Sequence, residues 1–400
     1  MPVLRARMTA RDVTESHRAS SPLELLFDLT FVVAIALIAS QLAHSIEGGH
    51  ALETLGPFCM VFFAIWWAWM NFTWFASAYD TDDVLYRVLT LVQMGGVLVL
   101  AAGVPAAFEG NDFTAATVGY LIMRIGLVSL WIRAAIQHPE GRLTAIRYAV
   151  GITVVQALWV SRLLLPDGGP WWVFVVIALL DLAVPPWAER TGTTAWHAHH
   201  IAERYGLFVI ILLGESVLAS TVGVQASLAA GLSLDLVIIA GAGLVLLFAL
   251  WWLYFSEPAG EGLESRRERS FFWGYGHYGV FASLAAIGAG LEVAVQSTIP
   301  VGEAEHAAEH HVSAQAVGFA VAIPVTIFIV LLWALHAPLV DRVVIQPLAI
   351  AVASALILLL PLAANELGVA TTIVGIALVT VLLLVVTLVD AARKARTVAA

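Results

Sequence analysis

Runs of about twenty apolar residues follow one another along the whole chain. A helix rises 1.5 Å per residue, so a run of about twenty residues crosses the roughly 30 Å hydrocarbon core of a bilayer. Of the 400 residues, 60% are hydrophobic and only 12% are charged, which is about half the charged share of a soluble protein. These features exclude a soluble globule and predict an all-α polytopic membrane protein.

Twelve such runs predict about twelve transmembrane helices. We expect them at residues 22–45, 53–79, 85–108, 113–137, 143–165, 170–188, 202–224, 234–256, 270–297, 313–335, 343–362 and 369–390. The short polar joints leave no room for a soluble domain. Residues 1–21 are basic like the start of a signal peptide, but the run that follows opens with Pro22, Glu24 and Asp28 and is too long for one. We therefore expect residues 1–21 to form a tail and the first helix to be retained.

The basic residues predict the orientation of these helices. With the N-terminus inside, every Lys and Arg outside the helices falls on alternate joints or on the two tails, and the opposite joints hold none. Cytoplasmic joints collect Lys and Arg, so both termini are expected in the cytoplasm of a multi-pass cell-membrane protein. Arg204 is counted among these joint residues, whereas Arg124, Arg133 and Arg162 fall within helices.

A weak internal repeat divides the chain into halves. The second helix carries Trp66-Trp67 and the eighth carries Trp251-Trp252, each ahead of a charged joint. Six helices per half is an even number, which predicts two parallel repeats related by an axis along the membrane normal. The expected divisions are a first repeat at 22–189, a cytoplasmic linker at 190–201, a second repeat at 202–390 and a cytoplasmic tail at 391–400. Tryptophan pairs in aromatic belts are the alternative explanation.

Polar residues deep in the helices are the candidate site, because a charge in the bilayer needs a partner, a cavity or water. Glu24 and Asp28 are spaced i,i+4, so both carboxylates lie on one helix face. The alternatives are that Glu24 serves the first helical turn and that Asp28 pairs with an arginine.

Glu215 is expected near the midplane, between the small residues Gly214 and Ser216. It is either a proton or ion site or a structural partner of Arg124. Asp181 and Arg124 are the other deep charges, and the sequence leaves open whether Arg124 pairs with Asp28, Asp181 or Glu215. His277 either titrates or donates a hydrogen bond across helices.

Neither a metal nor a cofactor is expected. His197, His199 and His200 precede Glu203, and a second histidine group lies among acidic residues at 303–311, but neither group matches a zinc signature. The single cysteine, Cys59, excludes an intramolecular disulfide. No phosphate-binding or nucleophile motif stands between a strand and a helix. The net charge of −10 would repel nucleic acid.

Two long motifs resemble one family. Residues 21–35 read SPLELLFDLTFVVAI and residues 200–216 read HIAERYGLFVIILLGES. In this order they resemble the two signatures of the bacterial low temperature requirement protein A (LtrA) family, over essentially the whole chain. The family is named for a growth phenotype, so the resemblance implies no particular activity. More distantly, residues 27–35 are similar to the first-helix Phe-Ser-Asp signature of a class of potassium channels with six helices per repeat, although Leu26-Phe27 replaces Phe-Ser.

The leading hypothesis is a proton- or ion-coupled transporter of a small solute, because alternating access uses deep titratable groups and paired repeats. An ion channel and an intramembrane lipid-modifying enzyme built on Glu24, Asp28, His199, His200 and Glu203 are the alternatives, and a non-enzymatic role is favoured. The expected partners are membrane lipids, protons or small ions and a small solute. The candidate pathway residues are Asp28, Glu215, Arg124, Asp181, His277, Glu24, Glu203 and Arg204.

Overall fold

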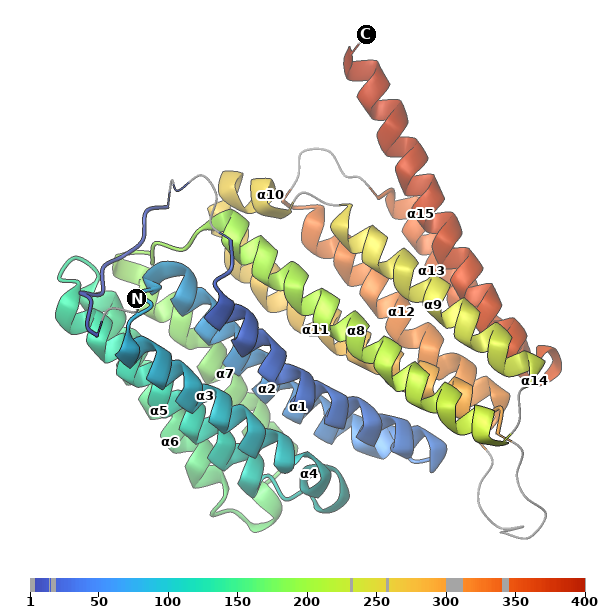
Figure 1. Cartoon of the computed structure of the whole chain (residues 1–400), viewed down its shortest axis with the longest axis horizontal. Helices are drawn as coiled ribbons and strands as arrows, with labels where there is room; N and C mark the ends of the chain where they lie inside the picture. Colours follow the sequence, from blue (N-terminus) through green and yellow to red (C-terminus); the bar gives the residue numbers. More distant parts are fainter. Residues whose placement is uncertain are drawn as a thin grey trace. The chain divides into compact units, whose positions relative to one another are not determined.

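A computed structural model describes residues 4–13, 15, 19–230, 233–256, 259–299, 312–339 and 345–399 (Figure 1). Within these ranges all regular structure is helical, which confirms the predicted all-α class. The long helices are α1 (Pro22–Glu47), α2 (Ala51–Tyr79), α3 (Val84–Ala102), α5 (Thr114–Gln137), α6 (Arg142–Arg162), α7 (Trp171–Ala188), α8 (Ala198–Ala230), α9 (Leu234–Phe255), α11 (Ser270–Gln296), α12 (Ala314–His336), α13 (Pro347–Leu359) and α15 (Val369–Ala399). The short helices are α4 (Val104–Gly110), α10 (Ala259–Ser265) and α14 (Ala364–Leu367).

Eleven helical segments of the described chain are long and apolar enough to cross a membrane. They coincide with eleven of the twelve expected spans. The remaining expected span, 202–224, lies within α8, some of whose side chains are outside the described set. The chain is therefore a multi-pass membrane protein, while the side on which its termini lie remains a prediction.

One expected span is interrupted. The run at 85–108 forms α3 and α4, which are separated at Gly103. Pro105 stands in the first turn of α4, where its missing N–H costs nothing. Inside a continuous helix the same proline would remove a hydrogen bond and clash with the carbonyl four residues earlier. The pattern of apolar residues in the sequence does not predict this break.

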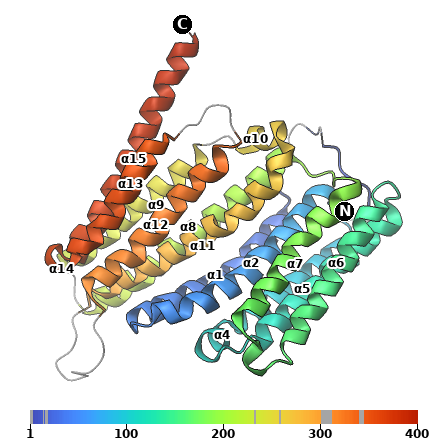
Figure 2. The same cartoon turned by 180° about the vertical axis from the view of Figure 1, so that it is seen from behind.

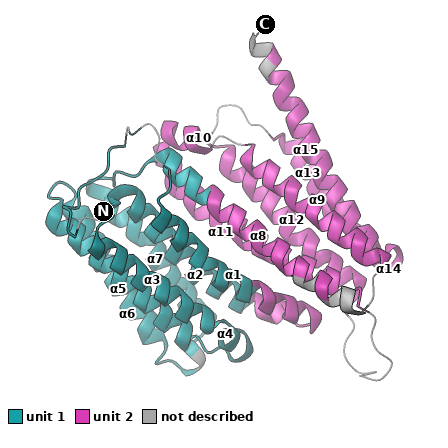
Figure 3. Ribbon diagram, viewed as in Figure 1, with its two compact units in different colours: residues 1–38, 56–205 teal, residues 39–55, 206–400 magenta. Residues whose placement is uncertain are grey.

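The chain forms two compact units (Figure 3). Unit 1 contains residues 1–38 and 56–205, and unit 2 contains residues 39–55 and 206–400. These bounds differ from the expected halves, because the end of α1 and the start of α2 belong to unit 2. The first two turns of α8 belong to unit 1, together with the start of α1.

In unit 1, α3 packs on α5. Helix α5 packs on α6, and α6 on α7 (Figure 2). The contact between α3 and α5 depends on glycine, because a Cβ added to Gly119 would lie 2.3 Å from the backbone nitrogen of Leu100. Small residues of this kind let transmembrane helices approach closely. The ring centroids of Phe27 and Phe72 lie 4.0 Å apart, and this contact joins α1 to α2.

In unit 2, α11 packs on α12, α9 on α15, and α12 on α13. Gly290 is again a point of close approach, because an added Cβ would lie 2.5 Å from the carbonyl oxygen of Ala320. Both units thus use glycine at one principal helix contact. This shared device does not test the internal repeat, which remains a prediction.

Candidate functional site

The start of α1 forms a capping box. The hydroxyl of Ser21 accepts a hydrogen bond from the backbone N–H of Glu24 at 3.3 Å, and the Oε2 of Glu24 accepts one from the N–H of Ser21 at 2.8 Å. The sequence S-x-x-E favours this reciprocal arrangement, and Pro22 suits the first helical position. One of the two carboxylate oxygens of Glu24 therefore serves the first helical turn, as the alternative interpretation of this residue expected.

The other oxygen of Glu24 belongs to a buried charge cluster. Oε1 lies 3.0 Å from Nη1 of Arg204 and 3.1 Å from Nε2 of His200. Arg204 also donates from Nε to Oδ2 of Asp28 at 3.0 Å and from Nη2 to Oδ1 at 2.5 Å. Trp69 donates from its indole N–H to Oδ1 of Asp28 at 2.7 Å. We call these five residues the charge cluster.

Helical spacing brings the charge cluster together. Glu24 and Asp28 lie i,i+4 on α1, and His200 and Arg204 lie i,i+4 on α8, so each pair shares one helix face. Every member is at most 1% exposed. The expected pair of carboxylates therefore faces a pair of basic side chains within unit 1, and Asp28 is paired with Arg204 rather than with Arg124.

Among the side chains of the charge cluster, two carboxylates face one guanidinium and one imidazole. Such side chains need counter-charges and hydrogen-bond partners, because an unbalanced charge is costly in a buried site. Oε1 of Glu24 lies 3.1 Å from Nε2 of His200, a distance at which an acid and an imidazole can share a proton.

A second buried network surrounds Arg124. The hydroxyl of Tyr120 donates to Oδ2 of Asp181 at 2.9 Å and accepts a hydrogen bond from Nη2 of Arg124. Arg124 lies 3.6 Å from the same carboxylate oxygen, and the indole of Trp159 donates to it at 3.1 Å. Asp181 is thus the partner of Arg124 among the three acids that the sequence left open.

A third ion pair lies at the ends of α3 and α5. Asp83 caps α3 by accepting from the N–H of Tyr86 at 2.9 Å, and Nη1 of Arg133 donates to it at 2.8 Å. The backbone N–H of Ala6 donates to the same carboxylate at 2.9 Å, which holds the N-terminal tail on unit 1. Burial alone would raise the pKa of Asp83, but these hydrogen bonds outweigh it and lower that pKa to about 2. The sequence analysis did not identify this pair.

Two of the predicted site residues lie in unit 2. Glu215 is 9% exposed and makes no hydrogen bond or ion pair with any described residue. It lies within electrostatic range of Glu292. His277 is fully buried, and its Nδ1 lies 2.7 Å from the carbonyl oxygen of Trp273 while its Nε2 lies 3.2 Å from the hydroxyl of Tyr254 on α9. The expected hydrogen bond across helices is present at His277.

The remaining candidates lie outside the charge cluster. Glu203 is exposed and accepts from the backbone N–H of Ser20 at 3.2 Å. His199 is exposed, and Nε2 of His197 lies 2.8 Å from the carbonyl oxygen of Glu15. The histidine group at 306–311 lies outside the described residues. Across the described part of the chain, no three His, Cys, Asp or Glu side chains are arranged to hold a metal ion.

A chain whose described part is all-helical, with eleven membrane-length helical segments and several buried charges, is an integral membrane protein. It belongs to the bacterial low temperature requirement A protein (LtrA) family, whose sequence model matches residues 19–387. It is 28% identical over 295 residues to the uncharacterized protein RA0937 of Rhizobium meliloti (strain 1021), and the match covers 67% of each chain. No solved structure is significantly similar.

Proposed function

We propose that the protein is a proton-coupled transporter of a small solute and that Glu24 and His200 hold the coupling proton. The observation that carries this proposal is the position of Oε1 of Glu24, which is buried between Nε2 of His200 and Nη1 of Arg204. Ionisable residues inside a membrane protein are costly and are commonly part of a proton or ion pathway.

Gain or loss of this proton changes the attraction between α1 and α8. When Glu24 is ionised, Arg204 interacts with carboxylates at two levels of α1, at Glu24 and at Asp28. When Glu24 is protonated, only the Asp28 carboxylate retains its charge. A change in the forces between two helices is what a transporter needs to favour one of two conformations, because a ligand shifts an equilibrium only by its differential affinity.

The enzyme alternative has less support. It requires Glu24, Asp28, His199, His200 and Glu203 to converge, and His199 and Glu203 lie outside the charge cluster with exposed side chains. The three acids and bases that do converge are buried and bonded to Arg204 or to one another. A channel is distinguished from a transporter by experiment, because a channel passes ions without a solute.

The test is proton uptake in liposomes that contain the purified full chain and a trapped pH-sensitive dye. The membrane potential is clamped with potassium and valinomycin, and panels of amino acids, small carboxylates and polyamines are added. We expect at least one class of solute to produce solute-dependent proton uptake. Glu24→Gln should abolish this uptake while the protein remains folded, because glutamine also completes a capping box.

Glu203→Gln is the matched control, because it makes the same chemical change in the unit 1 part of α8, outside the charge cluster. It should retain uptake. Proton flux without any added solute would instead support the channel. Uptake that is equal in Glu24→Gln and the native protein would reject Glu24 as the proton site.

A further inference from the structure

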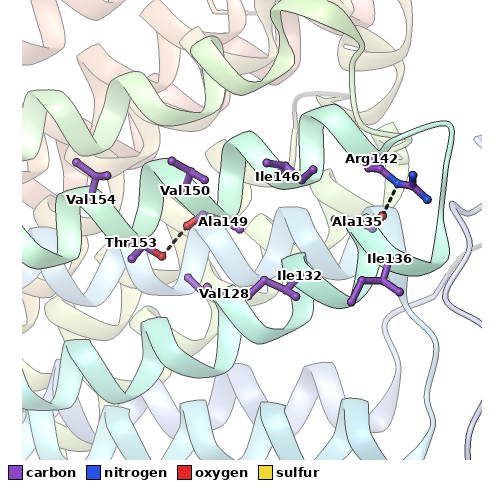
Figure 4. Close-up of a pocket in the computed structure, with 10 residues that line it drawn as sticks. All are labelled: Val128, Ile132, Ala135, Ile136, Arg142, Ile146, Ala149, Val150, Thr153 and Val154. Atoms are coloured by element: carbon purple, nitrogen blue, oxygen red, sulfur yellow. Dashed lines mark hydrogen bonds between the residues drawn. The ribbon is translucent and has the colours of Figure 1, made fainter.

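A groove runs along the surface of unit 1 between α5 and α6 (Figure 4). Its volume is about 600 Å³. The apolar side chains that line it are Val128, Ile132 and Ile136 on α5 and Ile146, Val150 and Val154 on α6. Arg142 stands at one end of this row and Val154 at the other (Figure 4). We call this feature the α5–α6 groove.

The walls of the α5–α6 groove are apolar and exposed. Ile136 is 68% exposed and Val150 is 50% exposed. Both helices are membrane-length segments, so hydrocarbon rather than water contacts most of this surface. The one hydroxyl in the lining, that of Thr153, donates to the carbonyl oxygen of Ala149 at 2.7 Å, which leaves the middle of the groove without an available donor.

The polar end differs from the rest of the groove. Nε of Arg142 donates to the carbonyl oxygen of Ala135 at 3.0 Å, which holds the guanidinium beside the last turn of α5 (Figure 4). Within the described chain Arg142 forms no ion pair, so its two terminal nitrogens remain available to an anion. The joint between α5 and α6 is one of those predicted to face the cytoplasm.

We propose that the α5–α6 groove binds an acyl chain of an anionic phospholipid and that Arg142 holds the phosphate of that lipid. From Arg142 to Val154 the helix α6 rises about 18 Å, which is more than half the thickness of the hydrocarbon core. An apolar slot of this length with a cation at its cytoplasmic end matches a lipid of the inner leaflet, where anionic headgroups are attracted to basic side chains. This site is independent of the charge cluster.

Native mass spectrometry of the full chain in detergent tests the proposal. The purified protein is titrated with phosphatidylglycerol and with phosphatidylcholine that carries the same acyl chains. We expect the native protein to retain phosphatidylglycerol preferentially, and Arg142→Gln to weaken that binding about fivefold, to the level of phosphatidylcholine. Arg147→Gln is the matched control, because Arg147 lies on the same helix but donates to Thr191 at 2.9 Å. It should keep the preference.

Two further probes separate the parts of the site. Val150→Trp should reduce the binding of both lipids by filling the groove, and circular dichroism and gel filtration establish that each variant remains folded. Glycerol phosphate, which has the headgroup chemistry without acyl chains, should not displace phosphatidylglycerol. Displacement by glycerol phosphate would identify a soluble phosphate site and overturn the proposal. An unchanged lipid preference in Arg142→Gln would also overturn it.

Discussion

Arg204 donates hydrogen bonds from Nε and Nη2 to both carboxylate oxygens of Asp28, a residue 176 positions earlier in the chain. This bidentate geometry uses the planar fork of a guanidinium, which the single ammonium of lysine cannot reproduce. The third nitrogen, Nη1, is thereby aimed at Glu24. One side chain of α8 thus fixes the positions of two acids on α1.

Removal of Arg204 should be strongly destabilising. In Arg204→Gln two carboxylates lose their buried counter-charge, and the loss of one partner of a buried ion pair costs about 3–5 kcal/mol. Asp28→Asn in the same chain should recover part of that loss, because one uncompensated charge is then absent. Thermal unfolding of the two single variants and the double variant in detergent measures the coupling.

Arg87→Gln, which breaks an exposed pair with Asp82, is the control and should change stability by less than about 1 kcal/mol. Additive effects of Arg204→Gln and Asp28→Asn would contradict the pairing.

Stability should fall in strong acid through Asp83. The pKa of Asp83 is about 2 in the folded protein and 3.8 without its partners, so folding favours the ionised form. Its contribution of roughly 2 kcal/mol is complete above about pH 4 and is lost as the pH falls through 2. Melting temperatures between pH 2 and 6 should therefore fall more steeply in the native protein than in Asp83→Asn. Parallel curves would show that Asp83 is not responsible.

The network around Arg124 should be structural. Tyr120→Phe removes the hydroxyl that lies between Arg124 and Asp181, and we expect a loss of about 1–3 kcal/mol because buried polar groups then lack a hydrogen bond. Solute-dependent proton uptake should persist in Tyr120→Phe liposomes at the native rate per folded molecule. A folded Tyr120→Phe protein without uptake would place this network in the transport pathway.

Glu215 is the second candidate for a transported proton. It has no ion pair within the described chain, so Glu215→Gln should fold with nearly native stability. We expect this variant to lose proton-linked uptake, because glutamine keeps the shape of the side chain but cannot titrate. Glu292→Gln on α11 tests the neighbouring acid in the same way. Full uptake in Glu215→Gln would remove Glu215 from the pathway.

The predicted orientation can be tested with single cysteines. The native Cys59 is exposed and must first be replaced by alanine. Gly49 and Gly169 lie in joints that are expected outside, but their φ values of 74° would strain a cysteine, so His50 and Asp112 are better positions. Cysteine at His50 or Asp112 should react with an impermeant maleimide from outside, and cysteine at Glu140 only after the membrane is opened. Labelling of all three positions from one side would reject the expected orientation.

The sequence predicted the helices well because the signal for each is local. An apolar run of about twenty residues specifies a membrane helix without reference to the rest of the chain. The same applies to Glu24 and Asp28, whose i,i+4 spacing placed them on one face. The break at Gly103 was missed because Pro105 was not weighed against the apolar run that contains it.

Partners that are distant in sequence could not be predicted in the same way. Arg204 was counted as a residue of a cytoplasmic joint, whereas it lies inside α8 and is fully buried. No spacing rule connects it with Asp28, or Arg133 with Asp83. The contact between Tyr120 and Arg124 could have been predicted from the sequence, because the two residues are spaced i,i+4 on the same face of α5.

Glu24 has one oxygen in the capping box and the other against Arg204 and His200, so a single carboxylate joins the cap of a helix terminus to two buried basic side chains. Glu24→Ala removes both roles at once and cannot tell them apart. Ser21→Ala weakens only the helix terminus, and Glu24→Gln removes only the charge. A change in the charge of Glu24 would therefore act on the first turn of α1 as well as on the contact between α1 and α8.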